Sequence, residues 1–223
     1  LRLFVTICHA VDAAHRALIV HRDIKPSNIL VDASGNPKLL DFGIAKLLDE
    51  EEGATRSASV PLTPGYAAPE QYAGGVITTA TDVYALGILL HELLLGERPK
   101  LEPTLRRASS RVAELSTDLW LLPLSRTALR TALKGDIDNV LSTALEAEAG
   151  RRYASAGALA DDINRYLDAQ PVLAHPPSRW YRARKFVQRH RGGVAVSAAL
   201  ALAVIASLGI ALWQARHAQI QAQ

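Results

Sequence analysis

The sequence predicts a mainly α-helical α+β domain that is followed by one membrane-spanning helix. Two observations predict the domain. Residues 82–95, DVYALGILLHELLL, are apolar nearly all round, as is typical of a helix buried in a core. The stretch NILVDASGNPKLLDFG holds two short apolar runs joined by turn residues, which predicts a β hairpin. The span is predicted by residues 194–213, twenty residues without a charge, which as a helix would cross the roughly 30 Å core of a bilayer.

The other elements follow from local patterns. Hydrophobic residues make up 49% of the 223 residues and charged residues 21%, so most of the chain can bury a core. The predicted elements, in chain order, are a helix at 3–18, a short strand at 18–20, hairpin strands at 29–31 and 38–40, a long loop at 44–70, the buried helix at 82–95, helices and loops of unclear bounds at 100–135, and helices at 136–146 and 155–168. A long loop inside a compact domain is usually functional.

The ends and the charge distribution suggest how the chain is organised. Methionine is absent and Leu1 comes first, so we expect a fragment that lacks its N-terminus. The one cysteine, Cys8, excludes an internal disulfide and suits a reducing compartment. The net charge of +3 is unevenly spread, because residues 179–191 hold six Lys or Arg and no acid.

Three short motifs carry the chemistry. HRDIKPSN occupies residues 21–28 between two apolar runs, DFG follows a predicted strand at 41–43, and APE ends the long loop at 68–70. Each is weak alone, but the three in this order resemble the catalytic half of a eukaryotic-type protein kinase. The resemblance covers about residues 1–170 and implies the C-terminal lobe of that fold, with short β hairpins at the catalytic loop.

The resemblance implies roles for four polar residues and implies ATP and Mg²⁺ as cofactors. Asp23 would orient or accept the proton of the incoming hydroxyl, and Lys25 would offset charge near the transferred phosphoryl group. Asn28 and Asp41 would hold Mg²⁺, which prefers hard oxygen ligands. The alternatives are ordinary loop solvation for Lys25 and Asn28 and a strand-end cap for Asp41. These alternatives are poor for all four residues together.

The same resemblance indicates the acceptor and a regulatory site. D-x-K-x-x-N and TPGY at 63–66 are similar to serine/threonine kinases, with Thr63 as the threonine that faces the substrate, so protein Ser or Thr hydroxyls are the expected substrates. Arg22 would pair with a phosphate on the long loop. Thr55, Ser57 and Ser59 are the candidate phosphate acceptors, and plain loop hydroxyls are the alternative.

Three residues are expected to have structural roles. Glu70 of APE would pair with an arginine of GRRYAS, and we expect Arg152 rather than Arg151. Asp82 would bond the backbone of the catalytic loop from below. Its simpler role is favourable negative charge at a helix N-terminus.

A whole kinase also needs an N-terminal lobe with a Gly-rich loop and a strand lysine. Neither G-x-G-x-x-G nor a VAIK-like strand occurs in these 223 residues. We therefore expect residues 1–170 alone to bind ATP poorly and to transfer little phosphate.

The C-terminal part resembles bacterial transmembrane serine/threonine kinases. We expect a proline-rich and basic juxtamembrane linker at 171–191, a transmembrane helix at 192–213 and the start of an extracytoplasmic segment at 214–223. The basic run predicts that the kinase part is cytoplasmic and the protein a single-pass protein of the inner (plasma) membrane. We interpret the run as contact with anionic lipid rather than with nucleic acid. The family also allows a homodimer.

The expected function is a membrane-linked signalling kinase that phosphorylates Ser or Thr of proteins, itself included. The main alternative is a catalytically inactive pseudokinase or scaffold, against which the four intact polar positions argue. A small-molecule phosphotransferase of the same fold would generally lack the APE-ended segment. A soluble all-helical binding protein would not need detergent.

Overall fold

The computed structural model describes residues 1–41, 63, 65–100, 106–115, 125–176 and 178–221. The described chain forms two compact units. The first comprises Leu1–Asp168 and Val172–Pro176, and the second comprises Ala169–Pro171 and Pro177–Gln223.

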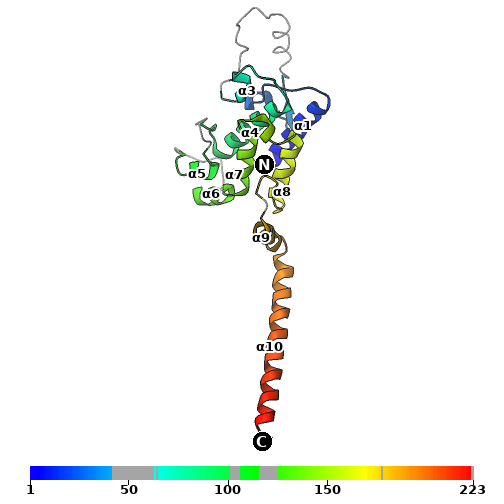
Figure 1. Cartoon of the computed structure of the whole chain (residues 1–223). Coiled ribbons are helices and arrows are strands. Elements are labelled where there is room, and N and C mark those ends of the chain that lie inside the picture. The colour runs from blue at the N-terminus through cyan, green and yellow to red at the C-terminus, as the bar shows by residue number, and fades with distance from the viewer. Residues whose placement is uncertain (42–62, 64, 101–105, 116–124, 177, 222–223) are drawn as a thin grey trace, which may run out of the picture. The chain divides into compact units, whose positions relative to one another are not determined.

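The first unit is mainly helical, as predicted, with one short two-stranded sheet (Figure 1). Its elements are α1 (Arg2–Arg16), the 3₁₀ turn η1 (Pro26–Asn28), β1 (Ile29–Val31), β2 (Pro37–Leu39), α3 (Pro69–Tyr72), α4 (Thr79–Leu95), α5 (Ala108–Arg111), α6 (Arg126–Leu133), α7 (Asp136–Ala144), the 3₁₀ turn η2 (Ala149–Arg151) and α8 (Ala156–Leu167). Helix α3 begins at Pro69, within the last two residues of the stretch predicted as a long loop, and residues 44–62 of that stretch lie outside the described residues.

Helix α4 is the central element, and its all-round apolar sequence explains why. The Thr78 side chain accepts a hydrogen bond from the amide of Ala80 and so caps the start of the helix. Gly96 ends it with φ 72°, a left-handed conformation that glycine adopts without steric cost. Most of the residues between these caps are buried, as predicted.

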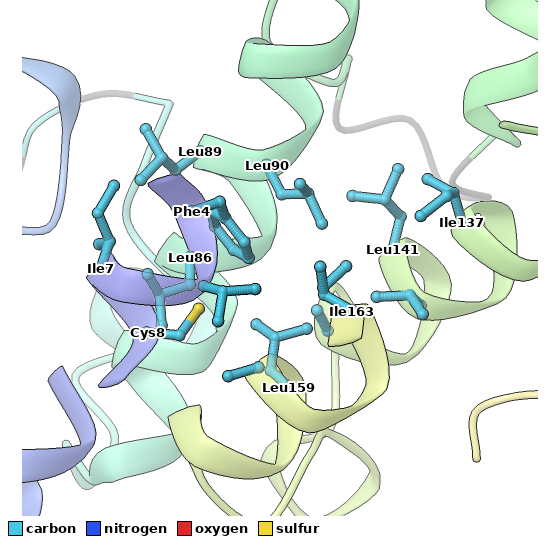
Figure 2. Close-up of a cluster of buried hydrophobic side chains, with 14 of the residues drawn as sticks. Phe4, Ile7, Cys8, Leu86, Leu89, Leu90, Ile137, Leu141, Leu159 and Ile163 are labelled. Carbon is cyan, nitrogen blue, oxygen red and sulfur yellow. The ribbon is translucent and has the colours of Figure 1, made fainter. Parts of the chain in front are cut away.

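The core forms where α1, α4, α7 and α8 meet (Figure 2). Helix α1 packs along α8, and α4 contacts α1, α7 and α8. Each helix contributes apolar side chains to the core, among them Phe4, Ile7, Cys8, Leu86, Leu89, Leu90, Ile137, Leu141, Leu159 and Ile163. Burial raises the pKa of the Cys8 thiol, so this cysteine is a packing residue rather than a reactive one.

The hairpin carries the chain from the catalytic loop to Asp41. Strands β1 and β2 are antiparallel, with Ile29 opposite Leu39, so the second strand begins one residue earlier than predicted. The Asp32 carboxylate accepts hydrogen bonds from two amides of the turn, and Gly35 has φ 82°. The amide of Leu40 donates to the carbonyl of Asn28 over 2.8 Å, which ties the end of the hairpin to the catalytic loop.

The predicted strand at 18–20 is wrong. The amides of Leu18 and Ile19 donate to the carbonyls of His15 and Ala14, so this stretch closes the C-terminal end of α1 instead. Leu18 has φ 62° and is 93% exposed, neither of which suits a buried strand.

The second unit contains two helices, α9 (Arg179–Arg189) and α10 (Arg191–Gln221). The segment 171–191, expected as a linker, thus includes a helix that Ser178 caps. Within α10, Arg191–Ile210 is long and apolar enough to cross a membrane, with a mean hydropathy of 2.3. The helix does not stop at residue 213 but continues to Gln221.

Candidate active site

Asp82 fixes the start of the catalytic loop. Its carboxylate accepts hydrogen bonds from the backbone amides of His21 and Arg22, each over 2.8 Å, and Nε2 of His15 lies 2.8 Å from it. Arg22 has φ 67°, and a left-handed conformation costs a non-glycine residue about 1–2 kcal/mol. Because Asp82 is 1% exposed and sits in the first turn of α4, the most buried helix holds the loop in this shape.

Asp23, Lys25 and Thr63 form one hydrogen-bonded cluster. Lys25 Nζ lies 2.8 Å from Oδ2 of Asp23 and donates to Oγ1 of Thr63 over 2.9 Å. The Thr63 hydroxyl donates to Oδ1 of Asp23 over 2.8 Å. Residues forty positions apart are thus brought together, and the carboxylate already binds a hydroxyl on one oxygen and an ammonium on the other.

Asn28 lies against the same carboxylate. Its Nδ2 donates to the backbone oxygen of Asp23 over 2.9 Å and to Oδ2 over 3.2 Å. Both bonds use the amide nitrogen, which leaves Oδ1 as the atom able to ligate a cation. An amide oxygen is a hard ligand of the kind that Mg²⁺ prefers.

Asp41 follows Leu40, whose backbone amide and carbonyl are both hydrogen-bonded. The amide of Leu40 is bound to Asn28, and the Leu40 carbonyl lies 3.0 Å from Nε2 of His21. Since a carbonyl only accepts, the His21 ring carries its proton on Nε2. Asp41 itself is exposed and has φ 49°.

The described residues would supply only some of the ligands of a bound magnesium ion. Among the described residues, no three His, Cys, Asp or Glu side chains gather closely enough to hold a metal ion. Magnesium usually keeps several waters and binds through one or two carboxylates plus phosphate oxygens. One carboxylate, from Asp41, and one amide oxygen, from Asn28, therefore suit Mg²⁺ that is shared with a nucleotide.

The predicted regulatory residues are only partly visible. Thr55, Ser57 and Ser59 lie outside the described residues. Arg22 is described, and its carbonyl accepts a hydrogen bond from Nε2 of Gln71 over 3.2 Å. The Gln71 side chain also accepts from the amide of Ala68, so it links APE to the catalytic loop.

Glu70 and Arg152 form an ion pair between a partly exposed carboxylate and a buried guanidinium, 82 residues apart in the sequence. Each terminal nitrogen of the guanidinium binds one Glu70 oxygen, over 2.7 and 2.8 Å. The remaining donors reach the carbonyls of Glu146, Ala80 and Ala147, so all five N–H groups are used. The Arg152 side chain is fully buried, and its guanidinium also stacks over a tyrosine ring.

Acid is expected to weaken this pair. Burial alone raises the pKa of the Glu70 carboxyl, but hydrogen bonds from Arg152, the backbone and Thr81, with the Arg152 charge, lower it below its usual value. A depressed folded-state pKa gives stability that is present above the unfolded value of about 4.3 and lost as the pH falls through the folded value. Below a pH of about 4.3, the free energy of unfolding of the Glu70→Gln variant should therefore change less with pH than that of the wild-type protein. If the free energy of unfolding fell equally steeply with pH in both proteins, the pair would not be the source of the acid sensitivity.

Several site contacts were not predicted from the sequence. His15 reaches Asp82 from α1 across 67 positions, and no local pattern marks it. The Tyr66 hydroxyl donates to Glu92, and this bond, together with burial, raises the pKa of Tyr66. Gln71 supplies only half of a capping box, because Ala68 at the start of α3 has no side-chain acceptor, so the usual Ser/Thr-x-x-Glu/Gln pattern is not present in the sequence.

Comparison with known proteins identifies the family of the domain. The model of the protein kinase domain matches residues 2–161. A probable serine/threonine-protein kinase of Corynebacterium efficiens is 38% identical over 165 residues, covering 72% of this chain and 24% of that protein. Serine/threonine-protein kinase PknB of Mycobacterium tuberculosis is 33% identical over 168 residues, covering 75% of this chain and 26% of PknB.

The solved structures give the same fold. The kinase domain of Mycobacterium tuberculosis PknI matches with a TM-score of 0.50 and 27% identity, over 73% of this chain and 53% of that one. The chain spans about a quarter of the length of the curated relatives it matches. The matched domain covers most of its 223 residues, and the relatives are bacterial serine/threonine kinases. This chain therefore belongs to the protein kinase family.

Proposed function

We propose that the chain is the C-terminal lobe of a serine/threonine protein kinase. It would transfer the γ-phosphate of ATP to Ser or Thr hydroxyls of proteins, itself included. The observation that carries the proposal is the cluster of Asp23, Lys25 and Thr63, in which a carboxylate holds a hydroxyl and an ammonium at hydrogen-bond distance. An N-terminal lobe with a Gly-rich loop and a strand lysine would complete the ATP site.

Each polar residue then has a task in the transfer. Asp23 orients the acceptor hydroxyl and takes its proton, at the oxygen that Thr63 already contacts. Lys25 offsets negative charge beside that oxygen. Asn28 and Asp41 would hold Mg²⁺, which neutralises charge on the phosphates when it is bound with ATP.

The second unit supports a place in the membrane. After Arg191, residues 192–210 of α10 carry no charge and none of them is buried, and a single helix of this length suits a bilayer core. Six Lys or Arg lie at 179–191, whereas residues 211–223 hold one, Arg216. By the positive-inside rule the kinase domain would face the cytoplasm, where ATP is available, from a single pass through the inner membrane.

The test is phosphate incorporation from labelled ATP. The assay would use the product translated from the start codon of the gene, in detergent, followed by identification of the phosphorylated amino acids. We expect phosphate on Ser or Thr. A folded protein that binds ATP and incorporates none would instead be a membrane-anchored pseudokinase.

The Thr63 hydroxyl gives a finer test of the cluster. Thr63→Ala removes one bond to Asp23 and one from Lys25, and a hydrogen bond to a charged group is worth about 1.5–3 kcal/mol. We expect phosphate transfer to fall by roughly 10-fold or more, at 1.4 kcal/mol per factor of ten. Thr63→Ser keeps the hydroxyl and should retain most of the rate. Equal rates for the two variants would refute this role.

A further inference from the structure

Helix α9 has an apolar side that the rest of the second unit leaves uncovered. At 3.6 residues per turn, Trp180, Ala183, Phe186 and Val187 fall on one side of the helix. Trp180 is 82% exposed, Phe186 55% and Val187 46%. Large apolar side chains gathered on one side of a short helix mark an interaction surface.

The rest of α9 is strongly basic. Arg182, Lys185 and Arg189 repeat at i, i+3 and i+7 on the opposite side, Arg184 borders the apolar side, and Arg179 lies at the N-terminal end of the apolar side itself. No acidic residue occurs between positions 179 and 191. Like charges at these spacings repel one another and destabilise an isolated helix, so an anionic partner would stabilise α9.

The place of α9 in the chain indicates which partner covers it. His190 alone separates α9 from α10, and the chain leaves the helical conformation there with φ −111° and ψ 30°. Figure 1 shows α9 as a separate short helix at the start of the long α10. If residues 191–210 span the bilayer, covalent connection keeps the C-terminal end of α9 next to the headgroups, and the apolar side would bring the rest of the helix down onto them.

We propose that α9 lies along the cytoplasmic surface of the membrane and binds anionic phospholipid. Its apolar side enters the boundary between headgroups and acyl chains, and its cations contact the phosphates. Arginine and lysine stems are long enough to reach headgroup depth from the flanks of the apolar side. The inference rests on the proposed span. Nucleic acid would use the cations alone and would leave Trp180 and Phe186 in water.

Tryptophan fluorescence of the full chain in lipid vesicles tests the proposal. The variant W120F/W213F keeps Trp180 as the only tryptophan, and W120F/W180F keeps Trp213 as a reporter of the span. Each is reconstituted into phosphatidylcholine vesicles with or without phosphatidylglycerol, using lipids brominated near the headgroup end of the acyl chain as quenchers. In vesicles with phosphatidylglycerol we expect Trp180 emission to shift to shorter wavelength and to be quenched.

Charge reversal separates the basic side from the apolar side. Arg182→Glu with Lys185→Glu is added to each single-tryptophan protein. It should reduce the quenching of Trp180 in W120F/W213F and leave the quenching of Trp213 in W120F/W180F unchanged. Quenching of Trp213 alone would overturn the surface helix but leave the span. Quenching of neither would overturn both, and Trp180 quenching that is equal without phosphatidylglycerol would overturn the role of the cations. Kinase activity in detergent is measured separately and depends on neither result.

Discussion

Replacing Asp23 by asparagine is expected to lower phosphate transfer by about 10²- to 10⁴-fold, the usual contribution of a positioned general base. The amide has nearly the shape of the carboxylate but has neither its charge nor its basicity. In the wild-type chain, the carboxylate accepts from Thr63 and Asn28 and pairs with Lys25. The variant would leave the Lys25 ammonium without its counterion and the acceptor hydroxyl without a base.

The matched control is Asp32→Asn. This residue lies in the same region of the chain and makes the same change of charge, but its carboxylate bonds only amides of the hairpin turn and Lys38. Initial rates with labelled ATP should be compared at equal amounts of folded protein. We expect Asp32→Asn to keep the wild-type rate. An Asp23→Asn protein that is as active as this control would remove Asp23 from the catalytic role.

The sequence predicted the helices whose pattern was long and unambiguous. The buried helix at 82–95 became α4, and the helix at 155–168 became α8, because an apolar pattern over three or more turns leaves no other way to bury it. Three apolar residues at 18–20 carry no such information. The same letters fit a strand or the end of a helix, and the hydrogen bonds of α1 decided the outcome.

The motifs of the candidate site could be predicted from the sequence, but the contacts that hold the catalytic loop in place could not. Residue types within HRDIKPSN indicated the chemistry, since each suits phosphoryl transfer. The contact of Asp82 with His15 depends on how α1 packs against α4, which no local pattern contains. Helix α9 was not predicted for a different reason, because repulsion among its closely spaced cations disfavours a helix although an apolar repeat is present in the sequence.

Replacing Arg152 by methionine is expected to cost about 3 kcal/mol of stability, because the Glu70 carboxylate, with 15% of its side chain exposed, loses its partner where water is mostly excluded. Glu70 would lose both of its guanidinium bonds, and three backbone carbonyls would lose their donor. Methionine keeps the apolar length of the side chain, so lost packing contributes little. The midpoint of thermal unfolding, followed by near-ultraviolet circular dichroism in detergent, should fall by roughly 10 °C.

The neighbouring arginine is the control for this change. Arg151 pairs with Glu148 over 2.8 Å, but both side chains are about 70% exposed, and such a surface pair is worth about 0–1 kcal/mol. Arg151→Met should therefore leave the unfolding midpoint nearly unchanged. Adding Glu70→Gln to Arg152→Met should recover part of the loss, because the stranded carboxylate is then neutral. Equal losses for the two arginine variants would mean that burial of the Glu70–Arg152 pair does not set its contribution.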